Sequence, residues 1–395
     1  MKRSTLLLLA AGCWFNLAIS AEAAKPMVEL TVGDQAYAGR TVAHDKHHCW
    51  LLQPDGRMHQ LDLSEVSKFR KLPTKFAGMK GVDLRDQLQK EVGRELDVVG
   101  TEHYVVCAAK GQARAYAELF EQTYRSCRQY FQVRGLKIEP LEFPLVGIVF
   151  PTRRQFAEYM QQDGSQYSPG LMGYYSPLTN RCVLYQHGET TAMNDGVRPF
   201  DLTSPADRSH DPFDGYGMIE RSSSPNVFFR AGADSSVQDT IIHEGMHQVA
   251  FNIGVHSRCG QNPRWVVEGL ATVFEAPGIR ERSSSIRARL NHERFVWFGD
   301  YMKNRRQEKS LSKFIGSDTM FESATLDAYA QSWALTFYLL ETRSSQFAKY
   351  LIRLSERDPL KTITSQDRIA DFQAEFGKDI EWLEIEMGRF FVKLN

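Results

Sequence analysis

The segment that decides the fold of this chain reads Ile242-His243-Glu244-Gly245-Met246-His247. Residues four apart on an α-helix lie on one face, one turn apart, so both imidazoles can reach the same metal ion. Apolar residues recur at helical spacing on the adjoining face, and Asp234 or Ser235 can cap the helix before it ends near Gly254. We therefore predict a helix that presents two histidines to a metal, with Glu244 placed to act as a base.

A second helical segment follows and offers a third ligand. It reads Trp265-Val266-Val267-Glu268-Gly269-Leu270-Ala271-Thr272-Val273-Phe274-Glu275, and Glu268 lies 21 residues after His247. A catalytic zinc ion needs three protein ligands and an open position, and a turn through residues 254–263 would fold this helix back toward the first. We predict one Zn²⁺ ion per chain, bound by His243, His247 and Glu268. The alternative is that these are ordinary helix residues that bind no metal.

Glu275 lies seven residues after Glu268, on the same face of the predicted helix. An imidazole that binds a metal usually donates its second N–H to a carboxylate, a carbonyl or water. Glu275 is a candidate for that partner, and an ordinary surface glutamate is the other interpretation.

The order and spacing of these motifs resemble the gluzincins, zinc peptidases whose ligands are two histidines and a glutamate. The pattern W-x-x-E-G-x-A-x-x-x-E, which starts at Trp265, is more similar to the aminopeptidase-type branch than to thermolysin. Tyr329 lies 61 residues beyond Glu268 and resembles the tyrosine of the Y-x-K-G helix of that branch, with Gln331 and Ser332 in place of lysine and glycine. More closely, residues 100–390 look like a bacterial family of uncharacterised peptidase-like proteins in the peptidase MA-like clan.

The resemblance implies a zincin-like fold and the hydrolysis of a peptide or protein substrate by a metal-activated water. It implies that Glu244 is the general base and that Tyr329 hydrogen-bonds the tetrahedral intermediate; a core tyrosine on a helix is the alternative for Tyr329. The G-x-M-E-N segment that binds a free amino terminus in the aminopeptidases is absent from this sequence, so aminopeptidase specificity is not implied. The alternative function is a catalytically inactive, peptidase-fold binding protein of the cell envelope.

The chain divides into two predicted domains of an α+β fold. Residues 27–72 alternate in the manner of strands around the turn Pro54-Asp55-Gly56, which predicts a small N-terminal β-module. Residues 71–80 resemble a linker, and residues 80–395 form the predicted zincin-like domain with a mixed sheet and a helical C-terminal part.

Within the predicted zincin-like domain, strands are expected near residues 103–108 and 143–150, with a helix over residues 113–131 between them. A hairpin over residues 173–186 could supply an edge strand for an extended peptide. Residues 187–233, which are rich in glycine, serine, proline and aspartate, are predicted to be a loop insertion.

Charge and the amino-terminal residues bear on location and partners. Lysine plus arginine and aspartate plus glutamate each number 48, so overall charge gives no reason to expect nucleic acid as a partner.

A basic start, an apolar stretch and Ala21-Glu22-Ala23 predict a cleaved signal peptide over residues 1–23 and an exported protein, periplasmic or extracellular. Lipoprotein anchoring at Cys13 is the minor alternative. No transmembrane segment is expected in the mature chain, and the β-module could dock to a cell-envelope partner.

Two further groups of residues, the cysteines and a histidine cluster, could form sites. Five cysteines follow residue 23, an odd number that leaves at least one thiol unpaired, and Cys107 and Cys127 lie in apolar patterns typical of packing positions. His44, His47 and His48 cluster in the β-module, but successive residues of a strand point to opposite faces, which disfavours a shared metal.

Overall fold

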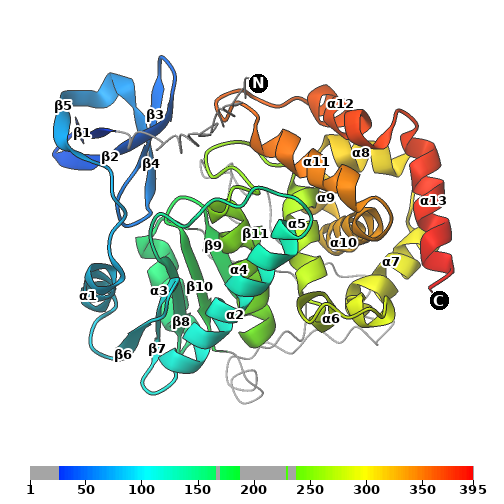
Figure 1. The fold of residues 1–395 in the computed structure, drawn as a ribbon, viewed down its shortest axis with the longest axis horizontal. Coiled ribbons are helices and arrows are strands. Elements are labelled where there is room, and N and C mark those ends of the chain that lie inside the picture. The colour runs from blue at the N-terminus through cyan, green and yellow to red at the C-terminus, as the bar shows by residue number, and fades with distance from the viewer. Residues whose placement is uncertain (1–25, 166–169, 187–227, 230–236, 395) are drawn as a thin grey trace, which may run out of the picture.

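The computed structural model describes residues 26–165, 170–186, 228–229 and 237–394. Figure 1 shows a small N-terminal sheet, a larger sheet covered by helices, and a helical C-terminal part. This arrangement confirms the predicted α+β class. The predicted signal peptide, Cys13, the proposed caps Asp234 and Ser235, and most of the 187–233 insertion lie outside the described residues.

The N-terminal sheet is antiparallel, with strand order β4-β3-β2-β1-β5. Gly56 has a φ of 87°, which only glycine adopts readily, so the predicted turn between the third and fourth strands is confirmed. The strands are β1 (Pro26–Val32), β2 (Gln35–His44), β3 (His48–Leu52), β4 (Met58–Asp62) and β5 (Val66–Lys75), and a short 3₁₀-helix spans Leu63–Glu65.

The prediction of a linker over residues 71–80 is wrong in its first half. The last strand, β5, continues to Lys75, and its residues pair with β1 as far as Pro26 opposite Lys75. Pro73 made this stretch look irregular, but proline is compatible with an edge strand because it needs no hydrogen bond on the open side.

The larger sheet is mixed, with strand order β11-β9-β10-β8-β7-β6. The strands β10, β8 and β7 run parallel to one another. On either side, β9 pairs antiparallel with β10 and β6 pairs antiparallel with β7, and β11 pairs antiparallel with β9. The strands are β6 (Leu96–Gly100), β7 (Tyr104–Ala109), β8 (Leu145–Phe150), β9 (Gly173–Ser176), β10 (Arg181–Tyr185) and β11 (Phe228–Phe229). The expected strands near residues 103–108 and 143–150 and the expected hairpin are therefore present.

Helices cover both faces of this sheet because both faces are apolar. Alternate residues of β7 divide between two cores: Val106 packs with helices α2 and α4, whereas Cys107 packs with α1 and α3. Cys107 and Cys127 are fully buried, as predicted, and the five cysteines of the described residues are free thiols. The helices are α1 (Gly81–Val92), α2 (Ala113–Gln132), α3 (Arg153–Gln162) and α4 (Val237–Asn252).

The C-terminal part is helical, as expected, and shares its core with α2 and α4. In Figure 1, α4 lies between the sheet and these helices. No helix of the described residues is long and apolar enough to cross a membrane. The helices are α5 (Arg264–Phe274), α6 (Pro277–Arg280), α7 (His292–Asn304), α8 (Ser310–Gly316), α9 (Met320–Ser323), α10 (Thr325–Thr342), α11 (Ser344–Ser355), α12 (Ser365–Phe376) and α13 (Ile380–Val392), with a 3₁₀-helix at Arg287–Arg289.

A buried arginine joins the N-terminal sheet to the rest of the fold. The Arg258 side chain, in the loop between α4 and α5, donates from Nε to the Pro177 carbonyl over 2.9 Å. Its Nη2 donates to the Gly56 carbonyl over 2.7 Å. One guanidinium therefore ties the β3–β4 turn to the β9–β10 turn. The domain boundaries themselves, at residues 72 and 80, stay predictions.

Candidate metal centre

Two histidines of α4 face each other at the centre of the fold. The side chain of His243 is 0% exposed and that of His247 is 1% exposed, and their Nε2 atoms lie 3.2 Å apart. Their rings are perpendicular, with centroids 4.7 Å apart. This is the arrangement expected for residues one helical turn apart that turn their Nε2 atoms toward a common point.

Helix α5 brings Glu268 to the same point. Its Oε2 atom lies 3.4 Å from Nε2 of His243 and 3.5 Å from Nε2 of His247. An ion held tetrahedrally at the usual zinc distances of about 2.0–2.2 Å separates its ligand atoms by about 3.3–3.6 Å. The three atoms therefore form a triangle of the size that such an ion requires, and the buried group His243, His247 and Glu268 could hold a metal ion.

The protonation of this group follows from burial and from its neighbours. Burial opposes the charge on Glu268, but the imidazoles of His243 and His247 outweigh it and bring the pKa of the carboxyl below its usual value. Burial lowers the pKa of His247. Burial also lowers the pKa of His243, but hydrogen bonds to Glu268 and Glu275 outweigh it and raise that pKa to about 9.

Glu275, at the C-terminal end of α5, contacts His243 from the other side. The Nδ1 atom of His243 lies 2.8 Å from Oε1 of Glu275. A carboxylate can only accept, so Nδ1 carries the hydrogen and Nε2 of the neutral ring keeps its lone pair for a metal. Asn291 in turn donates to Oε2 of Glu275 over 2.6 Å and to the Thr272 carbonyl over 3.1 Å.

Close packing of α5 against α10 places Tyr329 at the site. A Cβ atom at Gly269 would lie 2.6 Å from the carbonyl oxygen of Ser332, so only glycine permits this approach. Tyr329 is 0% exposed, and its ring centroid lies 6.5 Å from that of His243. Burial and the negative charges of Glu268 and Glu244 raise the pKa of its hydroxyl well above the usual value.

Glu244 is 0% exposed on the buried part of α4. Its charge contributes to the raised pKa of the Cys182 thiol on β10, behind burial as the main cause. The next residue, Gly245, faces α2: a Cβ atom there would lie 3.3 Å from Cγ2 of Thr123. The glycine in the motif thus allows α2 to pack tightly over the helix that carries the site.

The family comparison falls on this part of the chain. Residues 237–361 match the family Protein of unknown function (DUF1570). The matched segment contains all six predicted site residues: His243, Glu244, His247, Glu268, Glu275 and Tyr329. No curated protein is significantly similar to this chain. The match to DUF1570 therefore gives the metal centre a family context but no assigned activity.

Arg264 and Asn291 are contact residues of the site that the sequence interpretation missed. Arg264 begins α5, and its Nε lies 3.7 Å from Oε1 of Glu268. Its position, one turn before Glu268, is the signal that could have identified it. Asn291 follows Glu275 by 16 residues, and no spacing rule connects the two.

One prediction about substrate binding needs correction. The hairpin was expected to offer an open edge strand, but β9 pairs on its outer side with β11, with Phe228 opposite Tyr175 and Phe229 opposite Tyr174. The outer edge of the sheet is therefore β11. The prediction was wrong because β11 comes from the segment that the sequence presented as an irregular insertion.

Other ionisable groups of the described residues are arranged differently. Glu102, His103 and Glu121 also lie close together, but His103 and Thr101 both hydrogen-bond Glu121, over 2.6 Å and 2.8 Å. These two hydrogen bonds satisfy the Glu121 carboxylate, so it needs no metal ion. Within the described chain, His47 and His48 belong to no group of three possible ligands; the backbone N–H of each donates to Asp45.

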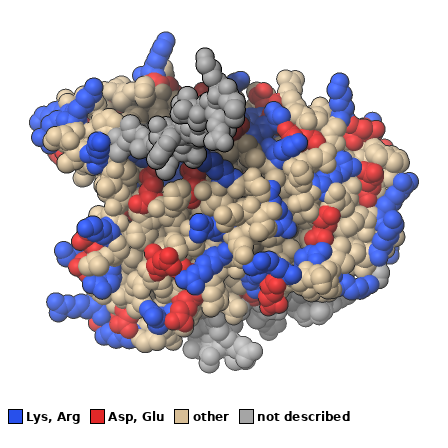
Figure 2. All heavy atoms as spheres, in the orientation of Figure 1, with Lys and Arg blue, Asp and Glu red and all other residues tan. Residues whose placement is uncertain are grey.

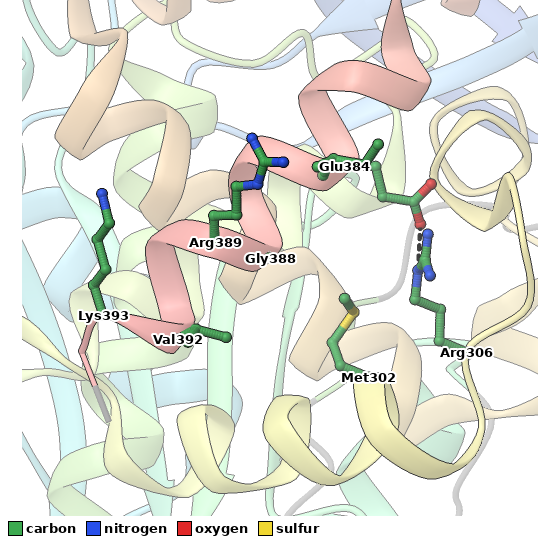
Figure 3. A pocket seen from close by; sticks show the side chains of 8 residues that line it. Met302, Arg306, Glu384, Gly388, Arg389, Val392 and Lys393 are labelled. Carbon is green, nitrogen blue, oxygen red and sulfur yellow. Dashed lines mark hydrogen bonds and ion pairs between the residues drawn. The ribbon is translucent and has the colours of Figure 1, made fainter.

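A surface hollow lies elsewhere, between α7 and α13. Figure 3 shows Arg306 and Glu384 at one side of it, joined by an ion pair of 2.8 Å, with Met302 and Val392 along its apolar wall. Its lining contains none of the metal-centre residues. Figure 2 shows acidic and basic side chains interspersed over the described surface of one face.

Proposed function

We propose that this protein is a zinc-dependent peptidase of the gluzincin type. The observation that carries the proposal is the triangle formed by Nε2 of His243, Nε2 of His247 and Oε2 of Glu268, with edges of 3.2, 3.4 and 3.5 Å. Two imidazoles and one carboxylate are a ligand set of catalytic zinc sites, which keep a fourth position open.

The adjoining residues support hydrolysis over simple metal storage. When bound, the zinc ion supplies a Lewis acid that activates a water and polarises the scissile carbonyl. Glu244, next to His243 on α4, then accepts the proton of the attacking water and returns it to the leaving amine. The raised pKa of Tyr329 keeps its phenol protonated, so it can donate a hydrogen bond to the oxygen that becomes negatively charged.

The substrate proposed is a peptide or protein outside the cytoplasm. The export part of this proposal rests on the sequence of residues 1–23, and docking to a cell-envelope partner through the N-terminal sheet stays a prediction as well. The equal numbers of acidic and basic residues give no reason to propose a nucleic acid.

A cell-envelope binding protein that keeps the peptidase fold without turnover is the second candidate. The pairing of β11 with β9 supports it, because β11 takes up the edge of β9, where an extended substrate would otherwise add to the sheet. Gly173 of β9 packs against Thr240 of α4, and Tyr175 packs with Val267 of α5, so this strand runs beside the metal centre.

The first test is the zinc content of the purified mature protein, measured by elemental mass spectrometry. We expect about one zinc ion per chain, and almost none in a His243→Ala, Glu268→Ala double variant. Incubation with a mixed peptide library should then show cleavage that a chelator stops and added zinc restores. Zinc without cleavage would favour the binding protein, and a parent protein that takes up no zinc would refute the peptidase and leave the binding protein as the better candidate.

A further inference from the structure

Arg264 lies beside the predicted metal ligand Glu268. It is the first residue of α5 and lies one turn before Glu268, so the two side chains share a face of the helix. Its side chain is 24% exposed, and Nε lies 3.7 Å from Oε1 of Glu268. The guanidinium also lies over the ring of Phe321, with Cζ 4.6 Å from the centroid. These contacts hold the cation between α5 and α9.

The two oxygens of Glu268 face different partners. Oε2 is the oxygen that lies 3.4 and 3.5 Å from the imidazoles. Oε1 is the oxygen that faces Arg264. An ion pair to one oxygen of a carboxylate favours metal binding through the other oxygen.

The same guanidinium also acts on the proposed oxyanion donor. Burial is the main cause of the raised pKa of the Tyr329 hydroxyl, and the positive charge of Arg264 opposes that rise. The charge of one side chain therefore acts on a metal ligand of α5 and on a candidate catalytic residue of α10.

The backbone at Arg264 is itself anchored. Its N–H donates to Oδ1 of Asp318 over 3.1 Å, and Arg368 of α12 donates to the two oxygens of Asp318 over 2.7 and 2.9 Å. The start of α5 is thereby fixed to the C-terminal helices. A long side chain that leaves from an anchored backbone can hold its contacts at a lower entropy cost.

We propose that Arg264 is a positioning residue of the metal centre, an inference that rests on the proposed function. It keeps Glu268 bound to the ion through one oxygen, which leaves a coordination position open. Arg264 would orient a ligand and not bind the metal itself. Replacement of residues that orient metal ligands commonly changes metal affinity or activity by about 10- to 100-fold.

The test uses Co²⁺ in place of zinc, because its visible spectrum reports coordination number without any substrate. Four-coordinate Co²⁺ absorbs several times more strongly than five- or six-coordinate Co²⁺. Arg264→Met should release Oε1 to the ion and lower the absorption by about twofold or more. Arg264→Lys, which keeps the positive charge, should stay close to the parent. Arg264→Gln gives a second neutral variant if the methionine variant does not fold.

Arg289 provides the matched control. Its side chain is 20% exposed and pairs with Glu341 of α10 over 2.5 Å, away from the metal ligands. Arg289→Met should leave the Co²⁺ spectrum unchanged. A parent-like spectrum in Arg264→Met and Arg264→Gln, or an equal change in Arg289→Met, would overturn the role of Arg264. A parent protein that binds no Co²⁺ would instead refute the metal centre and the proposed function with it.

Discussion

Nδ1 of His243 lies 2.8 Å from Oε1 of Glu275, and this contact orients the imidazole so that Nε2 faces His247 and Glu268. The contact joins His243, the first histidine of the α4 motif, to Glu275, the last residue of the α5 motif. It also explains why a glutamate stands at the end of α5, where a helix dipole by itself disfavours a negative charge.

Replacing Glu275 should weaken metal binding without removing it. Glu275→Ala takes away the acceptor at Nδ1, and we expect the zinc dissociation constant to rise about 10- to 100-fold. Competition with a chelator of known affinity measures the change. Glu281→Ala, an exposed glutamate just beyond α6, is the control and should bind zinc like the parent. Equal affinities in all three proteins would show that the contact orients nothing.

Zinc affinity should depend on pH through His243. The pKa of about 9 means that this imidazole is protonated in the metal-free protein at neutral pH, whereas a metal ligand must be neutral. The pKa values of His247 and Glu268 are lowered, so neither side chain has to lose a proton when the metal binds. Affinity should therefore rise about tenfold per pH unit from pH 7 and level off near pH 9. Dissociation constants at half-unit steps test this, and a flat profile would contradict it.

Glu244→Gln should separate metal binding from turnover. Glutamine has the same shape but cannot accept a proton, so the zinc content should stay near that of the parent. Peptide hydrolysis should fall by about 100-fold or more, the range typical for a general base. Elemental analysis and a cleavage assay on the same preparation give both quantities. Near-normal turnover in this variant would remove Glu244 from the mechanism.

Tyr329→Phe should reduce kcat while zinc stays bound. The phenol is buried beside His243, and its loss removes one hydrogen-bond donor to the developing oxyanion. The loss of such a donor typically costs about 100- to 1000-fold in kcat. Tyr350→Phe is a matched control, because Tyr350 is also 0% exposed but stacks on Trp265, away from the ligands. If the two variants were equally active, Tyr329 would be a core residue only.

An ion pair between α1 and β10 should contribute to the free energy of unfolding and be lost at acid pH. Glu91 of α1 accepts from Arg181 of β10, whose side chain is 3% exposed, over 2.8 Å. Glu91→Gln leaves a buried cation without its counter-ion, so we expect a loss of about 3 kcal/mol in the free energy of unfolding. Urea titration measures it. Glu118→Gln, from an exposed pair with Arg114, should cost less than about 0.5 kcal/mol.

The pH dependence of the same ion pair has a defined sign. Burial raises the pKa of Glu91, but Arg181 outweighs it and lowers the pKa below its usual value. The contribution is therefore present above the unfolded pKa of about 4.3 and is lost as the pH falls through the lower folded value. The difference between the parent and Glu91→Gln should shrink below about pH 4. A constant difference down to pH 3 would contradict this assignment.

The sequence predicted the elements that have a strong local signature. The two motif helices, the strands β7 and β8 and the turn at Gly56 all appear where periodicity and turn residues placed them. It failed at β5 and β11, which lie in stretches interrupted by Pro73 or rich in turn residues. Strand formation there depends on a partner strand from elsewhere in the chain, and local composition carries no information about that partner.

The sequence is sufficient to show which residues of α4 can reach one ion, because helical geometry alone places His243 and His247 one turn apart. It also indicates Glu268, Glu275 and Tyr329 through their spacing and their resemblance to a known motif. The packing of the helices is needed to bring Glu275 to His243, Asn291 to Glu275 and Arg264 to Oε1 of Glu268. Covalent geometry fixes neighbours within one helix, whereas contacts between helices depend on how α4, α5 and α10 pack around a shared core.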